Sequence, residues 1–170
     1  MYHRFRIGAL ALGLAAGGPL PKDPCALLKP AEIQAALAPD TKITAGVPTT
    51  KSLPLAVSCS YTWGPRTPQW GESSLLVMVI DLSQAWPGLS AEQIQQGVLL
   101  SAKGDKADAS LITGVGDAGV FTSKAGNYNG RAEAVLEAKG VHLSVEFHGG
   151  EVLSHKDKII ALLKGAARRL

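Results

Sequence analysis

The densest group of chemically active side chains in this chain of 170 residues lies in VHLSVEFH, residues 141–148. Its polar members, His142, Ser144, Glu146 and His148, alternate with apolar residues, so the pattern predicts a strand with all four on one face. Histidines and carboxylates on one face could chelate a divalent metal. His142 and Glu146 are four residues apart, about 13 Å along a strand, which is too far for them to share one ion.

A second strand is predicted over RAEAVLEAK, residues 131–139, where Glu133 and Glu137 share a face. The short turn that follows would pair this strand with residues 141–148 in a hairpin. Only Glu146 and His148, together with a cross-strand glutamate, could then converge on a metal. A metal site at Glu133, Glu137, Glu146 and His148 is therefore a candidate, and a solvated polar sheet face is the favoured interpretation. We expect no resident cofactor.

The sequence contains a match to one nucleotide-binding motif, and it lacks the motif of a common hydrolase class. GVGDAG, residues 114–119, matches the glycine fingerprint of dinucleotide-binding proteins. The residues after it, VFTSKAGNYNG, predict a strand and a turn where that fingerprint requires a helix to hold the pyrophosphate. We therefore interpret GVGDAG as a tight turn before a strand. No GxSxG-type elbow is present to support a Ser/His/Asp hydrolase.

Cys25, in DPCALLKPAEIQAAL (residues 23–37), is one of two cysteines and has four conceivable roles. A thiolate nucleophile at a helix start is chemically sensible, and a metal ligand is a second role. A lipid anchor would require the cysteine directly after the small residues of a signal, and KDP stands there instead. The favoured role is a disulfide with Cys59, which would close a loop of about 35 residues and contribute roughly 4 kcal/mol.

A candidate partner contact lies in the Pro- and Gly-rich segment GPRTPQWGES, residues 64–73, which predicts a loop. An exposed tryptophan at a loop tip is a typical anchor for a partner, so Trp70, with Arg66 and Gln69, is the candidate. The alternative is that Trp70 folds back onto the sheet.

The N-terminus predicts export. Residues 1–17 combine a short basic segment, an apolar run and small residues, which is typical of a secretory signal peptide and too short for a membrane span. Cleavage before Gly18 would leave residues 18–170 as one domain, in the periplasm or outside the cell. Without Arg4 and Arg6 the chain is nearly neutral, which excludes an electrostatic case for nucleic acid. No other segment predicts stable membrane insertion.

The predicted elements give an α+β fold. Helices are expected over 24–37, 86–104 and 154–168, and strands over 42–52, 56–63, 74–82, 115–123, 131–139 and 141–148. The order α-βββ-α-βββ-α, with short turns between strands, predicts helices packed on an antiparallel sheet of five to six strands. Because PAEIQAAL and SAEQIQQGV each precede strands, a two-unit repeat is conceivable. The run 74–82 is apolar on both faces and predicts a central, doubly covered strand.

DPCALLKPAEIQAAL, the CSYTW that contains Cys59, and GVGDAGVF together resemble a family of small exported bacterial proteins, many of them lipoproteins, of unknown function. The resemblance spans residues 23–121. It implies a disulfide between Cys25 and Cys59 and no established catalytic residues. Lys29 stands where the family pattern has threonine, and the signal has no lipobox.

These observations favour an exported, non-catalytic binding protein with a protein partner, such as a periplasmic inhibitor or an immunity-type protein. One alternative is a metal-dependent or hydrolytic enzyme that uses the polar face of the last two strands. Another is a structural component of the cell envelope.

Overall fold

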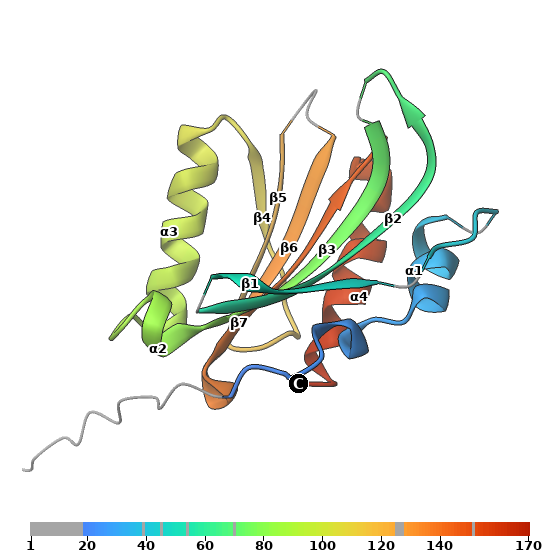
Figure 1. Ribbon diagram of the computed structural model, residues 1–170. Helices are drawn as coiled ribbons and strands as arrows, with labels where there is room; N and C mark the ends of the chain where they lie inside the picture. Colours follow the sequence, from blue (N-terminus) through green and yellow to red (C-terminus); the bar gives the residue numbers. More distant parts are fainter. Residues whose placement is uncertain are drawn as a thin grey trace, which may run out of the picture.

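The computed structural model describes residues 19–38, 40–44, 46–53, 55–69, 71–124, 128–150 and 152–170 (Figure 1). They form an α+β fold, as predicted, with an antiparallel sheet of seven strands instead of five to six. The strands are β1 (Val47–Leu53), β2 (Ala56–Thr67), β3 (Gly71–Asp81), β4 (Asp108–Leu111), β5 (Ala118–Ser123), β6 (Asn129–Leu136) and β7 (Val141–His148). The helices are η1 (Pro24–Leu27), α1 (Pro30–Leu37), α2 (Leu82–Ala85), α3 (Ala91–Gly104), η2 (Glu137–Lys139), η3 (Val152–His155) and α4 (Lys156–Ala167).

The sheet consists of two meanders that meet in its middle. Its strand order is β1-β2-β3-β7-β6-β5-β4, and every neighbouring pair is antiparallel. Strands β1 to β3 follow one another directly, as do β4 to β7, and the β3–β7 pair joins the two groups. The two-unit repeat considered from the sequence stays a hypothesis.

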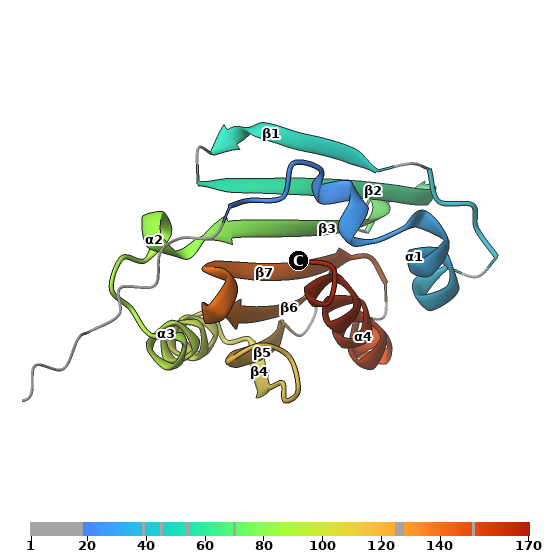
Figure 2. The same cartoon turned by 90° about the horizontal axis from the view of Figure 1, so that it is seen from below.

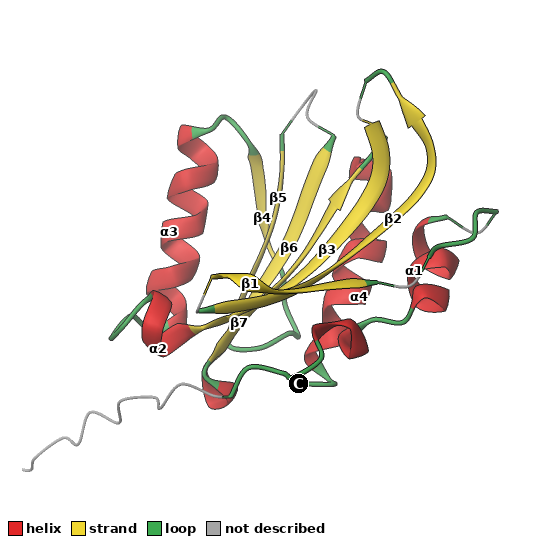
Figure 3. Ribbon diagram, in the orientation of Figure 1, coloured by secondary structure: helices red, strands yellow, loops and turns green. Residues whose placement is uncertain are grey.

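Helices cover the two faces of the sheet unequally. Helices η1, α1 and α4 lie on one face, where α4 packs on β6 and β7, and η1 packs on β2 and β3. Helix α3 lies on the opposite face, where its main contacts within the described residues are with β4, β5 and β6 (Figure 2). Figure 3 shows the sheet in yellow with the red helices at its flanks. On the α3 side, the helix therefore leaves the β2–β3 part of the sheet uncovered.

The unequal cover corrects the expectation for the central strand. Leu75, Val77 and Val79 of β3 are completely buried under η1 and its neighbours, in the main core. Leu76 and Met78, which point to the other face, are only half-buried. The strand is central in the sheet but fully covered on one face alone.

Several boundaries differ from the sequence prediction for local reasons. The expected 86–104 helix begins at Ala91, where Ser90 and Gln93 form the predicted capping box, with Ser90 N 2.9 Å from Gln93 Oε1. The short α2 precedes it, because Asp81 Oδ1 accepts a hydrogen bond from Ser83 N and caps a turn there. Strand β6 ends at Leu136, and the following three residues form η2.

Two segments predicted as loops contain strands. Residues 64–67 extend β2 and residues 71–73 begin β3, so the hairpin turn is much shorter than GPRTPQWGES suggests. The polar DKADAS segment contributes to β4, which lies at the edge of the described sheet and pairs with β5. Edge strands tolerate polar, mostly exposed side chains, which weakens their hydrophobic signal.

The N-terminal segment is fastened to the sheet by a disulfide between Cys25 and Cys59, with Sγ atoms 2.14 Å and Cα atoms 5.1 Å apart. This confirms the favoured role of Cys25. Arg169, near the C-terminus, donates from Nη1 to the Leu27 carbonyl oxygen at 2.7 Å and forms an ion pair with Glu32. The two ends of the described chain are thus joined beside α4.

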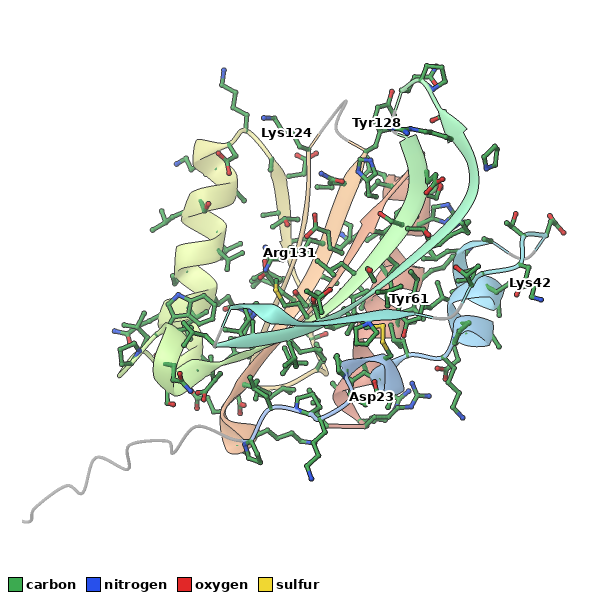
Figure 4. The ribbon with its side chains drawn as sticks, viewed as in Figure 1. Asp23, Lys42, Tyr61, Lys124, Tyr128 and Arg131 are labelled. Atoms are coloured by element: carbon green, nitrogen blue, oxygen red, sulfur yellow. A yellow bond between two sulfur atoms is a disulfide. The ribbon has the colours of Figure 1, made fainter. Side chains whose placement is uncertain are left out.

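Tyr61 lies beside the disulfide (Figure 4) and is 1% exposed. Its hydroxyl donates to the carbonyl oxygens of Leu28, at 2.6 Å, and Cys25, at 3.1 Å. Burial raises the pKa of Tyr61 to about 12, and the charges of Asp23 and Glu32 add to the effect. The fold therefore holds this phenol in its neutral form.

We expect Tyr61→Phe to lower the free energy of unfolding by about 1–3 kcal/mol at neutral pH, because two carbonyl groups lose their donor. The folded-state pKa lies above the unfolded value of about 10, so the contribution of Tyr61 is complete below pH 10 and is lost as pH rises toward 12. Urea denaturation between pH 7 and 12 measures both effects. Tyr128→Phe is the control, and an alkaline decline of equal size in wild type and Tyr61→Phe would contradict the assignment.

Candidate functional site

The four metal-site candidates of the sequence lie on the β6–β7 hairpin but do not converge. Glu146 lies opposite Arg131 in the strand register, and Glu133 lies opposite Ser144. His148 is hydrogen-bonded through Nδ1 to the Asn129 side chain. In the part of the chain that the structure describes, no group of three or more His, Cys, Asp or Glu side chains could hold a metal ion.

Glu137 lies in η2, outside the strand in which it was expected, and its side chain stabilises the start of α3. Its Oε1 accepts a hydrogen bond from the Ala91 backbone N–H at 2.5 Å, so the carboxylate satisfies a free donor in the first turn of α3. The Glu137 backbone N–H in turn donates to Asp117 Oδ2 at 2.7 Å. Glu137 thereby links the end of β6 to the start of α3.

The GVGDAG segment completes this link, which confirms its interpretation as a turn. The Asp117 backbone N–H donates to the Val135 carbonyl oxygen at 2.8 Å. Gly116 has φ +56°, and a Cβ atom there would lie 2.2 Å from the same oxygen. Glycine is required because the backbone passes too close to β6 for any side chain.

A cluster of three charged or titratable side chains, on β6 and β7, lies on the sheet face that α3 covers. Glu133 Oε2 lies 3.0 Å from His142 Nε2 and 3.3 Å from Arg131 Nη2. Glu133 is 5% exposed and His142 2% exposed, whereas one third of the Arg131 side chain reaches solvent. Trp86 packs edge-on against the His142 ring, with centroids 5.2 Å apart. The cluster therefore joins two strands of the sheet to the segment before α3.

The electrostatics of the cluster favour an ionised Glu133. Burial by itself raises the pKa of this carboxyl, but the hydrogen bond from His142 and the positive charge of Arg131 outweigh it, and the net pKa is lowered. The Glu133 carboxylate accepts a hydrogen bond from His142 Nε2, so Nε2 carries a proton in this arrangement. The other ring nitrogen of His142 is Nδ1.

Two polar atoms of the cluster are enclosed without a partner. Within the described residues, neither His142 Nδ1 nor Arg131 Nε makes a hydrogen bond. Each such group costs about 1–3 kcal/mol relative to a satisfied one. A desolvated charge cluster that also leaves polar atoms unpaired is more typical of a functional site than of a stabilising one.

The cluster opens into a groove between α3 and the sheet, which we call the α3 groove. One hollow of about 280 Å³ runs from Trp86 and His142 past Ala102 to Arg131. A second, of about 250 Å³, shares Asp105, Ala107, Thr122 and Arg131 with the first. It continues to four further residues, Ser123, Lys124, Asn129 and Glu146. Figure 4 shows Arg131 between α3 and the strands, and Lys124 at the upper end of β5.

The carboxylate–histidine pair resembles the orienting half of a hydrolase triad, but the nucleophile's half is not assembled. In a triad the second histidine nitrogen hydrogen-bonds a serine or cysteine. Ser144 is the hydroxyl opposite Glu133, and in the described structure His142 Nδ1 is bonded neither to it nor to another side chain.

The predicted partner contact is described only in part. Arg66 is exposed near the end of β2, Gln69 is exposed in the turn after it, and Trp70 lies outside the described residues. Arg66 and Gln69 belong to the β2–β3 hairpin, whereas the groove is formed by β5, β6, β7 and α3. Their role in partner binding stays a prediction.

Sequence reasoning found part of the groove and missed its centre. The alternation pattern placed His142 on the correct face of β7 and identified Glu133 as a candidate metal ligand. For His142, however, only the distance to Glu146 on the same strand was considered. Arg131 also lies two residues before Glu133, on the same face, which is a signal that alternation alone could have supplied. Trp86 and Asp105 line the groove because of the position of α3 relative to the sheet. No pattern in the neighbouring sequence predicts this position.

Comparisons with known proteins add no assignment. The chain matches no protein-family model, no curated protein and no solved structure. The resemblance of residues 23–121 to small exported bacterial proteins stays a prediction. Among the described helices, none has the length and apolar character needed to cross a bilayer.

Proposed function

We propose that this chain is an exported binding protein that holds its ligand in the α3 groove and does not transform it. The observation that carries the proposal is the Arg131–Glu133–His142 cluster at the base of the groove. It buries charge beside a surface hollow, at a cost in stability, where apolar side chains would serve a purely structural role better. The alternation of β6 and β7 places these side chains on the α3 side of the sheet, beside Trp86.

Export is supported by two independent features. Residues 1–17 have the pattern of a secretory signal, and the chain contains a disulfide, a bond that persists mainly in oxidising compartments. A periplasmic or extracellular location therefore belongs to the same proposal.

A hydrolase is the second candidate, because Glu133 orients His142 as a carboxylate orients the base of a triad. His142→Ala discriminates between the two. An enzyme would lose at least a hundredfold in hydrolysis of ester and glycoside test substrates, whereas a binding protein has no such turnover to lose.

The binding proposal is tested by calorimetry on the disulfide-bonded protein with four probes: a neutral hexasaccharide, inorganic phosphate, an acidic decapeptide and a basic decapeptide. Thr122→Trp should fill the groove, since Thr122 lines both hollows. We expect it to weaken binding of the active probe at least tenfold.

Thr62→Trp is the matched control, because Thr62 is exposed on β2, on the same face of the sheet but outside the groove. It should leave the affinity unchanged. Equal affinity in wild type and both variants, or no heat with any of the four probes, would overturn the proposal.

A further inference from the structure

The charges of the α3 groove disfavour a strongly charged ligand. Two cations, Arg131 and Lys124, stand among three carboxylates, those of Asp105, Glu133 and Glu146. Arg131 lies 3.3 Å from Glu133 and opposite Glu146 in the register, so its charge is largely compensated. A phosphate or a polyanion would meet more repulsion than attraction here. A cation would have to compete with Lys124 and Arg131.

The hydrogen-bonding groups of the groove alternate between donors and acceptors. Lys124 and Arg131 only donate, and the carboxylates of Asp105 and Glu146 only accept. Side chains that do both lie between them: Ser101, Thr122 and Asn129. A ligand that pairs with all of these must donate and accept along its whole length. Hydroxyl groups do this, because each carries one donor and two acceptor positions.

The end of the groove below α3 has a different character. Trp86 is half-buried and lines the first hollow together with Val98 and Ala102, two apolar residues that do not line the second hollow. An indole ring presents a broad apolar surface on which the C–H face of a ligand ring can lie. The groove therefore combines an apolar platform with hydroxyl-matching polar groups a short distance away.

The two hollows also limit ligand size. At about 280 and 250 Å³, each is just below the 300–1,000 Å³ typical of small-molecule pockets, and they share four lining residues. A ligand of two or three linked rings would span both.

From these observations we infer that the α3 groove binds an uncharged sugar chain, with one ring against Trp86 and the next beside Arg131 and Thr122. The inference rests on the proposed function and adds the chemical class of the ligand. An amphipathic ring with hydroxyl groups along its edge satisfies the apolar platform, the mixed hydrogen-bonding groups and the compensated charge together. A protein partner, which the sequence favoured, becomes an alternative outcome of the test.

The test is a calorimetric titration of the disulfide-bonded protein with two uncharged probes, a β-1,4-linked N-acetylglucosamine hexamer and a maltohexaose. We expect at least one to bind, and Trp86→Ala to weaken it tenfold or more. Binding should persist between 50 and 500 mM salt, because a neutral ligand contributes no ion pair. Circular dichroism establishes that the variant is folded. Thr122→Trp, with Thr62→Trp as control, decides the outcome should Trp86→Ala not fold.

The possible failures are distinguishable. If neither sugar binds while phosphate or a decapeptide does so in a Thr122→Trp-sensitive manner, the sugar inference is wrong and the binding function stands. If a sugar binds with unchanged affinity to Trp86→Ala and Thr122→Trp, the site lies elsewhere and both proposals are wrong.

Discussion

Removing the disulfide with the double substitution Cys25→Ala and Cys59→Ala should lower the free energy of unfolding by about 4 kcal/mol. The two residues are 34 apart in sequence, and a loop of that size restricts the unfolded chain by about this amount in the chain-entropy model. At about 2–4 °C per kcal/mol for a chain of this length, the melting temperature should fall by roughly 8–16 °C. Differential scanning calorimetry measures the change.

Reduction of the wild-type protein is the matched control, because it opens the bond without removing either side chain. Cys59 is completely buried, so the double variant should be slightly less stable than the reduced protein, by the packing lost at that site. A melting temperature that neither reduction nor substitution changes would show that η1 and α1 are held without the bond.

Gly116→Ala should cost about 3 kcal/mol or more. An alanine there would have to adopt φ +56°, at roughly 1–2 kcal/mol, and its Cβ would lie 2.2 Å from the Val135 carbonyl oxygen. That oxygen accepts the Asp117 hydrogen bond, so relief of the contact displaces the turn that also holds Glu137. Chemical denaturation gives the free energy.

Substitutions at two other glycines separate the effect of backbone strain from the effect of the close contact with Val135. Gly114 has φ +72° but only the Lys164 Nζ atom near its Cβ position, at 3.7 Å, so Gly114→Ala should show the backbone strain alone. Gly97→Ala, in α3 with open space around it, should be neutral or stabilising by up to about 1 kcal/mol. Equal losses for Gly114→Ala and Gly116→Ala would contradict the close-contact explanation.

Much of the fold was predictable because its determinants are local. The capping box at Ser90 and Gln93 and the alternation in residues 141–148 each act within a few residues. The cysteine pairing is a long-range contact, but a chain with two cysteines offers a single intramolecular pairing. Strand β4 was missed because an edge strand needs no apolar alternation, and its residues look like a polar loop.

The candidate site was predictable only in part, because its geometry depends on pairs across strands. Alternation assigns Glu133 and His142 to a face, but their contact is diagonal, since Glu133 lies opposite Ser144 and Val135 lies opposite His142. Register at this level is set by the hairpin turn, and the turn includes the η2 residues that were expected to extend the strand. For the same reason, Glu137 was expected on the strand beside Glu133, whereas it lies in η2 and accepts a hydrogen bond from Ala91 N–H.

The most direct test of the α3 groove as the binding site is backbone amide NMR of the ¹⁵N-labelled, disulfide-bonded protein during titration with the N-acetylglucosamine hexamer, then with the other probes. We predict that binding shifts the resonances of Thr122, Arg131, Glu133 and His142 and the indole N–H of Trp86, while those of Ser58, Ser60 and Thr62 on β2 stay unchanged. Shifts confined to the β2–β3 part of the sheet, or none with any probe, would contradict the account.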